Sequence, residues 1–194
     1  RSYDPETGRF INADDTDYLG YDDTPLSTNL FAYCENNPVK YKDEKGKVID
    51  VTYKEFQKDT FELGTALNSI NMADKHIAVI GENSYKWVTV YLTVLKSKGV
   101  IVPIDKELPV CDIINVLNDS DSEVLFYAKK YEKNIDEIAE KAPNVKYFIG
   151  FSTEKTEGNR LSYNEFKAEG KKLYEGGDKT YAEMITDHNN LKML

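Results

Sequence analysis

Apolar residues return at helical spacing in the part of the chain that begins near Lys47. Thr52 and Glu55 stand in the order of a capping box, in which each side chain accepts a hydrogen bond from the main chain of the other residue. The apolar positions that follow recur at near-heptad intervals, at Phe56, Leu63, Leu67 and Ile70. The pattern predicts a helix of about five turns that buries one apolar stripe.

Two short, continuous apolar runs follow, and they are typical of strands that are covered on both faces. They are HIAVIG (76–81) and VIVPID (100–105). Between them, Asn83 or Ser84 can cap a helix, and Gly99 is predicted to end it in the left-handed conformation. The apolar face of this helix carries Trp87, Tyr91, Val94 and Leu95. A strand, a helix and a strand in this order predict a βαβ unit with parallel strands.

The alternation of strands and helices continues after this unit. A helical pattern near 110–117 precedes the apolar run EVLFYA (123–128), and a helical pattern near 132–141 precedes VKYFIG (145–150). Repeated alternation of this kind predicts the α/β class, with a doubly wound, mainly parallel sheet.

Ser162 and Glu165 repeat the spacing of Thr52 and Glu55, and aromatic residues flank both pairs. An internal repeat would produce this echo. A second, independent capping box that opens another helix accounts for it more simply.

Residues 1–46 differ from the rest of the chain in composition and in the pattern of apolar positions. They are rich in Asp, Asn, Gly, Tyr and Pro, and turn signals recur every few residues. Short aromatic stretches between the turns, GRFIN and NLFAYC, predict small strands. Such a segment cannot bury a core unaided. We therefore divide the chain into a short β/turn-rich segment (1–46) and an α/β region (47–194).

Charge and composition exclude several classes of function. The formal net charge is −9 and the pI about 4.9, so a nucleic-acid partner is not expected. The longest apolar run is shorter than a membrane span, and the beginning of the sequence does not have the order of a signal peptide. These features predict a cytoplasmic protein.

The potential metal-binding and redox side chains are isolated along the chain. Cys34 and Cys111 have no CxxC spacing, and we interpret them as reduced, inert thiols. His76 and His188 stand alone, so neither a metal site nor a histidine-based triad is expected.

The sequence lacks the two common phosphate-binding motifs, GxGxxG and GxxxxGK[ST]. Gly81 stands alone after a predicted strand and is interpreted as a tight turn, and the pair Gly176-Gly177 is interpreted as a helix cap. Asn83 and Ser84 could offer main-chain donors to an anion, but a structural cap is the simpler interpretation.

The first segment resembles the end of the core of RHS-repeat proteins, which form shells and commonly carry a variable C-terminal toxin. The resemblance rests on YDPETGRFINADD, YLG, NLFAYCENNPV and DEKG, in this order, over residues 2–46. It implies a self-cleaving aspartyl protease site with Asp14 and Asp43 as its carboxylates. Asp15 and Glu44 stand where many members of the family have proline, so the protease motif is altered here.

The second region resembles the N-terminal subdomain of AMP-forming acyl-CoA synthetases, especially the long-chain type. The resemblance covers residues 48–194 and rests on TYKEF, IAVIGENSYKWV, GVIVPIDKELP and KKLYEGGDKTYAEMITDHNNLKML. It implies a truncated N-terminal subdomain of the adenylate-forming fold. In that family the Ser/Thr/Gly-rich phosphate loop would begin just after the last of these stretches.

The resemblance implies an activity for the complete family, which joins a fatty acid to coenzyme A through an acyl-adenylate. ATP, Mg and coenzyme A are the cofactors of the complete enzymes. No catalytic, cofactor-binding or metal-binding residue can be assigned here, and no cofactor is expected for this chain alone. The implied partner is the remainder of a ligase domain, because a sheet without its remaining strands exposes an edge and tends to associate.

Two other hypotheses of function stay open. Residues 47–194 could be the variable cargo of an RHS-type polymorphic toxin, which would be exported with an RHS shell as its partner. The α/β region could instead be a binding or immunity-like module that uses its sheet for protein contacts, since the fold alone does not determine function.

Overall fold

A computed structural model describes residues 3–4, 9–10, 39–42, 48–184 and 192–194. The first part forms two antiparallel strand pairs, β1 (Tyr3–Asp4) with β2 (Arg9–Phe10) and β3 (Val39–Lys42) with β4 (Val48–Val51). The predicted strand in GRFIN coincides with β2, whereas NLFAYC lies outside the described residues. β3 and β4 lie on the two sides of the boundary predicted at residues 46 and 47, which stays a prediction.

Five parallel strands form the sheet at the centre of the α/β region. They are β5 (His76–Ile80), β6 (Val100–Ile104), β7 (Val124–Tyr127), β8 (Tyr147–Gly150) and β9 (Arg160–Ser162). Their order is β6-β5-β7-β8-β9, and every neighbouring pair is parallel. The predicted doubly wound, parallel sheet is therefore confirmed.

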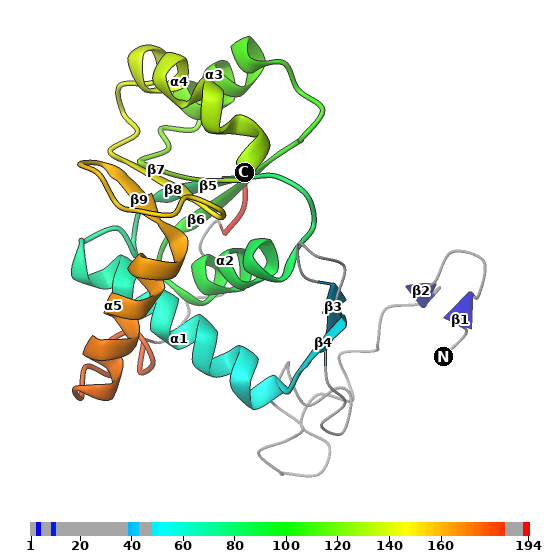
Figure 1. Ribbon diagram of the computed structural model, residues 1–194, viewed down its shortest axis with the longest axis vertical. Coiled ribbons are helices and arrows are strands. Elements are labelled where there is room, and N and C mark those ends of the chain that lie inside the picture. The colour runs from blue at the N-terminus through cyan, green and yellow to red at the C-terminus, as the bar shows by residue number, and fades with distance from the viewer. Residues whose placement is uncertain (1–2, 5–8, 11–38, 43–47, 185–191) are drawn as a thin grey trace.

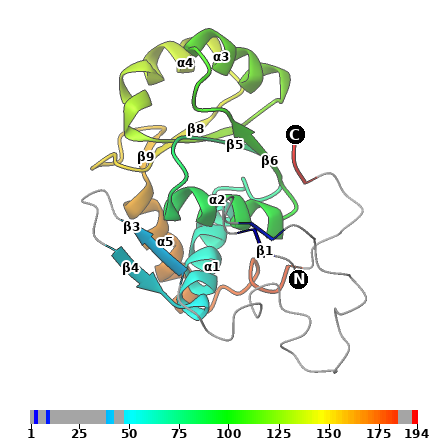
Figure 2. The same ribbon diagram turned by 90° about the vertical axis from the view of Figure 1, so that its right-hand side faces the viewer.

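Helices cover both faces of this sheet and make three layers (Figures 1 and 2). On one face lie α1 (Tyr53–Ser69), α2 (Tyr85–Lys96) and α5 (Tyr163–Glu175). On the other lie α3 (Val110–Asp119) and α4 (Ile135–Lys141), which follows the 3-10 helix η3 (Lys129–Asn134).

Successive residues of each strand supply the two apolar cores, because side chains alternate between the faces of a sheet. Ile77 and Val79 pack beneath α1, α2 and α5, whereas Ala78 and Ile80 pack toward α3 and α4. Since both faces are buried, the strands β5, β6, β7 and β8 are largely continuous apolar runs rather than alternating ones.

The capping box of α1 is confirmed. The Oγ1 of Thr52 accepts a hydrogen bond from the Glu55 amide at 3.2 Å, and Glu55 Oε2 accepts one from the Thr52 amide at 2.8 Å. Phe56, Leu63 and Leu67 are buried along one face of the helix, as the spacing predicts.

The prediction of a second capping box at Ser162 and Glu165 is wrong. Ser162 precedes α5, but its side chain makes no capping hydrogen bond. The Glu165 carboxylate accepts instead from the Thr156 amide at 3.0 Å, and the Thr156 hydroxyl accepts from the Ser162 amide at 3.1 Å. The reason is that Ser162 also ends β9, so its main chain is held by the loop before the strand rather than by the helix.

The prediction that Gly99 ends α2 in the left-handed conformation is also wrong. α2 ends at Lys96 and Ser97 is its C-cap. The Oγ of Ser97 accepts a hydrogen bond from the Gly99 amide at 2.9 Å, and Gly99 has no left-handed φ. A Cβ at Gly99 would lie 2.6 Å from the Lys75 carbonyl oxygen. This glycine therefore serves close packing rather than helix termination. The predicted cap at Gly176-Gly177 is confirmed, since Gly176 caps α5 and Gly177 has a φ of 107°.

Two features of the region have no clear signal in the sequence pattern. The helix predicted from residue 132 begins at Ile135, because η3 occupies the residues before it. β9 contains one apolar residue, Leu161, and forms a strand because the edge of β8 offers it main-chain partners. Within the part of the chain that the structure describes, no helix is long and apolar enough to cross a membrane.

Candidate functional site

The carboxyl edge of the sheet contains the place where an α/β fold of this kind binds ligands. From β5 the chain passes to β6 on one side and then to β7 on the other side of β5. The carboxyl ends of β5 and β7 therefore flank a topological switch point, the usual position of a ligand crevice. The loop at 81–84 follows β5 here and leads into α2.

The residues that follow β5 and β7 are in close contact at this switch point. Gly81 has a φ of 152°, and a Cβ on it would lie 2.7 Å from the Cβ of Ala128, which follows β7. The Ala128 amide donates to the Ile80 carbonyl at 3.0 Å. Gly81 therefore permits a tight turn against the neighbouring strand, as the sequence predicts.

The helix that starts at this edge is capped by its own chain. The Oγ of Ser84 accepts from the Trp87 amide at 3.2 Å, so of the two predicted candidates it is Ser84, and not Asn83, that caps α2. Lys86, in the first turn, donates to the Phe151 carbonyl after β8 at 2.5 Å. These contacts give the turn a structural role.

A carboxylate links the loops that follow the three strands at the switch point. The Glu82 carboxylate lies 2.5 Å from the ammonium of Lys106 and 3.7 Å from that of Lys130. Lys106 belongs to the loop that follows β6, and Lys130 to the residues that follow β7. The hydrogen bond from Lys106 lowers the pKa of Glu82, and the same bond raises the pKa of Lys106. The Tyr131 hydroxyl donates to the Lys106 carbonyl at 2.9 Å. These contacts join the loops to one another, and the Glu82 carboxylate balances part of the charge of the two lysines.

A second polar group, at the ends of β7 and β8, was not predicted. The Tyr127 hydroxyl lies 3.2 Å from Thr153 Oγ1 and 3.3 Å from Glu132 Oε1, and Thr153 donates to Glu132 Oε2 at 3.0 Å. Burial raises the pKa of Tyr127, which keeps the phenol protonated as a donor. No sequence spacing connects these residues, because they belong to a strand, a 3-10 helix and a loop.

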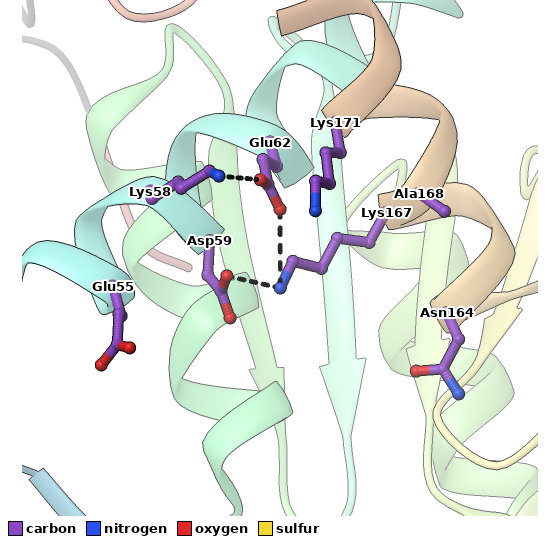
Figure 3. A pocket seen from close by; sticks show the side chains of 8 residues that line it. All are labelled: Glu55, Lys58, Asp59, Glu62, Asn164, Lys167, Ala168 and Lys171. Atoms are coloured by element: carbon purple, nitrogen blue, oxygen red, sulfur yellow. Dashed lines mark ion pairs between the residues drawn. The ribbon is translucent and has the colours of Figure 1, made fainter. Parts of the chain in front are cut away.

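A groove of about 380 Å³ lies between α1 and α5, on the face of the sheet that α1, α2 and α5 cover (Figure 3). Most of its lining side chains are charged: Glu55, Lys58, Asp59, Glu62, Asn164, Lys167, Ala168 and Lys171. Lys167 of α5 lies 2.6 Å from Asp59 and 3.7 Å from Glu62, both on α1. Tyr85 of α2 donates to Asp59 at 3.0 Å. The network joins three helices, and spacing along the sequence gives no signal for it.

Replacing Lys167 with methionine is expected to lower the free energy of unfolding by about 1–2 kcal/mol. The Glu62 side chain is only 4% exposed, and the change leaves it with the Lys58 ammonium at 3.7 Å as its remaining cation. Urea denaturation measures the effect, which should shrink in high salt. Lys171→Met is the matched control, because Lys171 lines the same groove and makes no ion pair among the described residues. An equal loss in both variants would contradict a specific role for Lys167.

The remaining candidates from the sequence are dispersed. His76 Nδ1 lies 2.5 Å from the Ser120 carbonyl, and Cys111 is an exposed free thiol. Among the described residues, no three His, Cys, Asp or Glu side chains gather where they could hold a metal ion. Asp14, Asp43, Cys34 and His188 lie outside the described residues.

The chain is similar to known proteins in sequence and in fold. A family model described as AMP-binding enzyme matches residues 32–188. The chain is 30% identical over 92 residues to a component of the mycosubtilin synthase of Bacillus subtilis, which is 47% of this chain and 3% of that protein.

Solved structures share the fold of the chain. An anthranilate CoA ligase in complex with anthranoyl-AMP matches with a TM-score of 0.58 and 20% identity, over 62% of this chain and 23% of the ligase. A protein named as a long-chain-fatty-acid CoA ligase from Rhodopseudomonas palustris matches with a TM-score of 0.59 and 12% identity, over 84% of this chain and 35% of that chain. The chain spans about a third or less of the length of each of these proteins.

Proposed function

The chain belongs to the AMP-binding enzyme family, and we propose from this that residues 48–194 are the N-terminal scaffold of an adenylate-forming ligase that activates a fatty acid. In such a reaction the carboxylate attacks the α-phosphate of ATP, which releases pyrophosphate and leaves an acyl-adenylate. Transfer of the acyl group to the thiol of coenzyme A then releases AMP.

The observation that carries this proposal is the family match over residues 32–188, which includes the complete five-stranded parallel sheet. The likeness to solved CoA ligases agrees in fold. The choice of a fatty acid rests on the sequence resemblance to long-chain synthetases, and one structural neighbour carries a matching name.

The described residues do not by themselves fit MgATP. A triphosphate needs several converging main-chain donors or cations, and Mg²⁺ needs carboxylate oxygens. At the carboxyl edge of the sheet, the Trp87 amide already donates a hydrogen bond to Ser84 Oγ, and the Glu82 carboxylate pairs with Lys106 and Lys130. These residues therefore supply no catalytic step, and we propose that the 194 residues alone are inactive.

Calorimetric titration with MgATP, followed by an acyl-adenylate assay with hexadecanoate, tests the proposed inactivity. The expected result is no binding heat and no adenylate. Tight nucleotide binding or turnover by this chain would overturn it. Such a result would place a working nucleotide site within these 194 residues.

A test of the substrate class must use the longest protein that the gene encodes. Exchange of labelled pyrophosphate into ATP is measured with a long-chain fatty acid, an aromatic acid and an amino acid in parallel. Exchange that depends on the fatty acid supports the proposal. Exchange with only one of the other acids would overturn the fatty-acid assignment but keep adenylation, and no exchange with any acid would overturn both.

A second candidate function rests on the resemblance of residues 2–46 to an RHS core. In this proposal the α/β region is cargo behind an RHS shell, and Asp14 and Asp43 release it by cleavage of the main chain. Two carboxylates can divide acid and base roles only where the fold brings them together. Intact mass measured for the chain and for its Asp43→Asn variant distinguishes cleavage from its absence. A neighbouring small immunity-like gene would favour this candidate, and a reading frame that runs on into a Ser/Thr/Gly-rich loop would favour the ligase.

A further inference from the structure

A pair of strands crosses the boundary that the sequence predicts at residues 46 and 47. β3 (Val39–Lys42) lies before this boundary and β4 (Val48–Val51) after it, and the two strands form one antiparallel sheet. Boundaries between domains usually fall in segments that few contacts cross. Here every residue of β3 is paired with a residue of β4, so the predicted boundary would divide a hairpin.

The residues that the hairpin pairs are complementary in chemistry. The register places Val39 opposite Val51, Tyr41 opposite Ile49 and Lys40 opposite Asp50. The first two pairs join apolar residues and the third joins opposite charges, and cross-strand pairs of both kinds stabilise an antiparallel sheet. A shift of one residue would place Tyr41 opposite Asp50 and lose this match. The sequences on the two sides of residue 46 are therefore suited to each other.

The connection between the two strands has the length and the composition of a hairpin loop. Residues 43–47 join β3 to β4 along the chain, and loops of up to about five residues are common in hairpins. The connection contains Asp43 and Gly46, and both residue types are favoured in turns. Asp43 therefore stands in the sequence where a hairpin calls for such a residue.

The hairpin continues into the α/β region without a linker. Thr52 is the single residue between β4 and α1, and its Oγ1 accepts a hydrogen bond from the Glu55 amide at 3.2 Å. The AMP-binding family match begins at residue 32, so it includes both strands of the hairpin. The strands β1 and β2, by contrast, form a sheet of their own.

We propose that the AMP-binding region begins with β3 and that the RHS-like segment ends before Val39. Asp43 then belongs to the hairpin of the AMP-binding region, and it does not form a protease site with Asp14. A cut that released the α/β region as cargo would have to lie on the N-terminal side of Val39. The inference rests on strand pairing and is independent of the proposed fatty-acid activation, but it counts against the cleavage in the second candidate function.

Charge reversal across the hairpin of the full chain tests whether β3 depends on β4. Lys40→Asp or Asp50→Lys alone places like charges opposite each other, and either change should speed hydrogen exchange of the β3 amides about threefold. The double variant restores opposite charges and should return exchange to the wild-type rate. Asp119→Lys is the matched control, because it changes the net charge as Asp50→Lys does but lies at the exposed end of α3.

Intact mass of the full chain tests the consequence for Asp43. The wild type and Asp43→Asn should each remain a single, uncut species during prolonged incubation. Cleavage of the wild type that Asp43→Asn abolishes would overturn the proposal. It would also be overturned if β3 amides were unprotected in the wild type, or if Asp50→Lys changed their exchange no more than Asp119→Lys does. Neither measurement involves a nucleotide, so failure of the proposed ligase function leaves both readouts valid.

Discussion

Tyr181→Ala should lower the free energy of unfolding by about 3–5 kcal/mol, the range for deleting a large buried aromatic ring. Tyr181 is fully buried, and its hydroxyl donates to the Thr93 carbonyl of α2 at 2.6 Å. Burial raises the pKa of this phenol, so it remains a neutral donor. The side chain packs the segment after α5 against α1 and α2. Chemical denaturation measures the contribution of this contact to the free energy of unfolding.

Gly64 of α1 makes this contact specific. A Cβ at Gly64 would lie 2.1 Å from Tyr181 Cζ, so Gly64→Ala should cost about 2–3 kcal/mol while the ring is present. In a Tyr181→Ala background the same change should be neutral or stabilise by up to about 1 kcal/mol, since alanine favours helix and fills space. Additive effects of the two substitutions would contradict direct packing. Tyr181→Phe is the control for the hydroxyl and should cost about 1 kcal/mol.

Gly170→Ala should destabilise the chain by about 3 kcal/mol, at the upper end of the usual cost of overpacking. Gly170 lies where α5 crosses α1, and a Cβ there would lie 2.0 Å from the Glu62 carbonyl oxygen and 2.9 Å from the Ala66 nitrogen. These are main-chain atoms, so the clash is relieved only by separating the helices. Thermal unfolding followed by circular dichroism measures the shift.

Glu169→Ala is the neighbouring control on the same helix. Glu169 is exposed and pairs with Lys172 at 2.6 Å, a surface ion pair whose loss should change stability by less than about 0.5 kcal/mol. If Gly170→Ala were as mild as this control, the helices would not be as close as the structure places them. A concurrent loss of the contact between Lys167 and Asp59 would confirm that α5 moves as a unit.

Local patterns succeeded where the interactions that decide the structure lie within a few residues. Thr52 and Glu55 cap α1 as predicted, because both partners belong to one helical turn. The same spacing at Ser162 and Glu165 failed, since a loop amide at Thr156 competes for the carboxylate. Gly99 failed for a similar reason, because the packing of its backbone against Lys75 is not visible in a local pattern.

The sequence by itself determined the α/β class, the parallel strands and most helix positions, since these follow from apolar periodicity and short-range capping. Only the tertiary structure decided which distant residues meet: Lys167 with Asp59, Tyr181 with Gly64, and Lys192 with Ile101. Partners that lie about a hundred residues apart leave no periodic signal. Their contact depends on how the layers pack, and packing is a property of the whole fold.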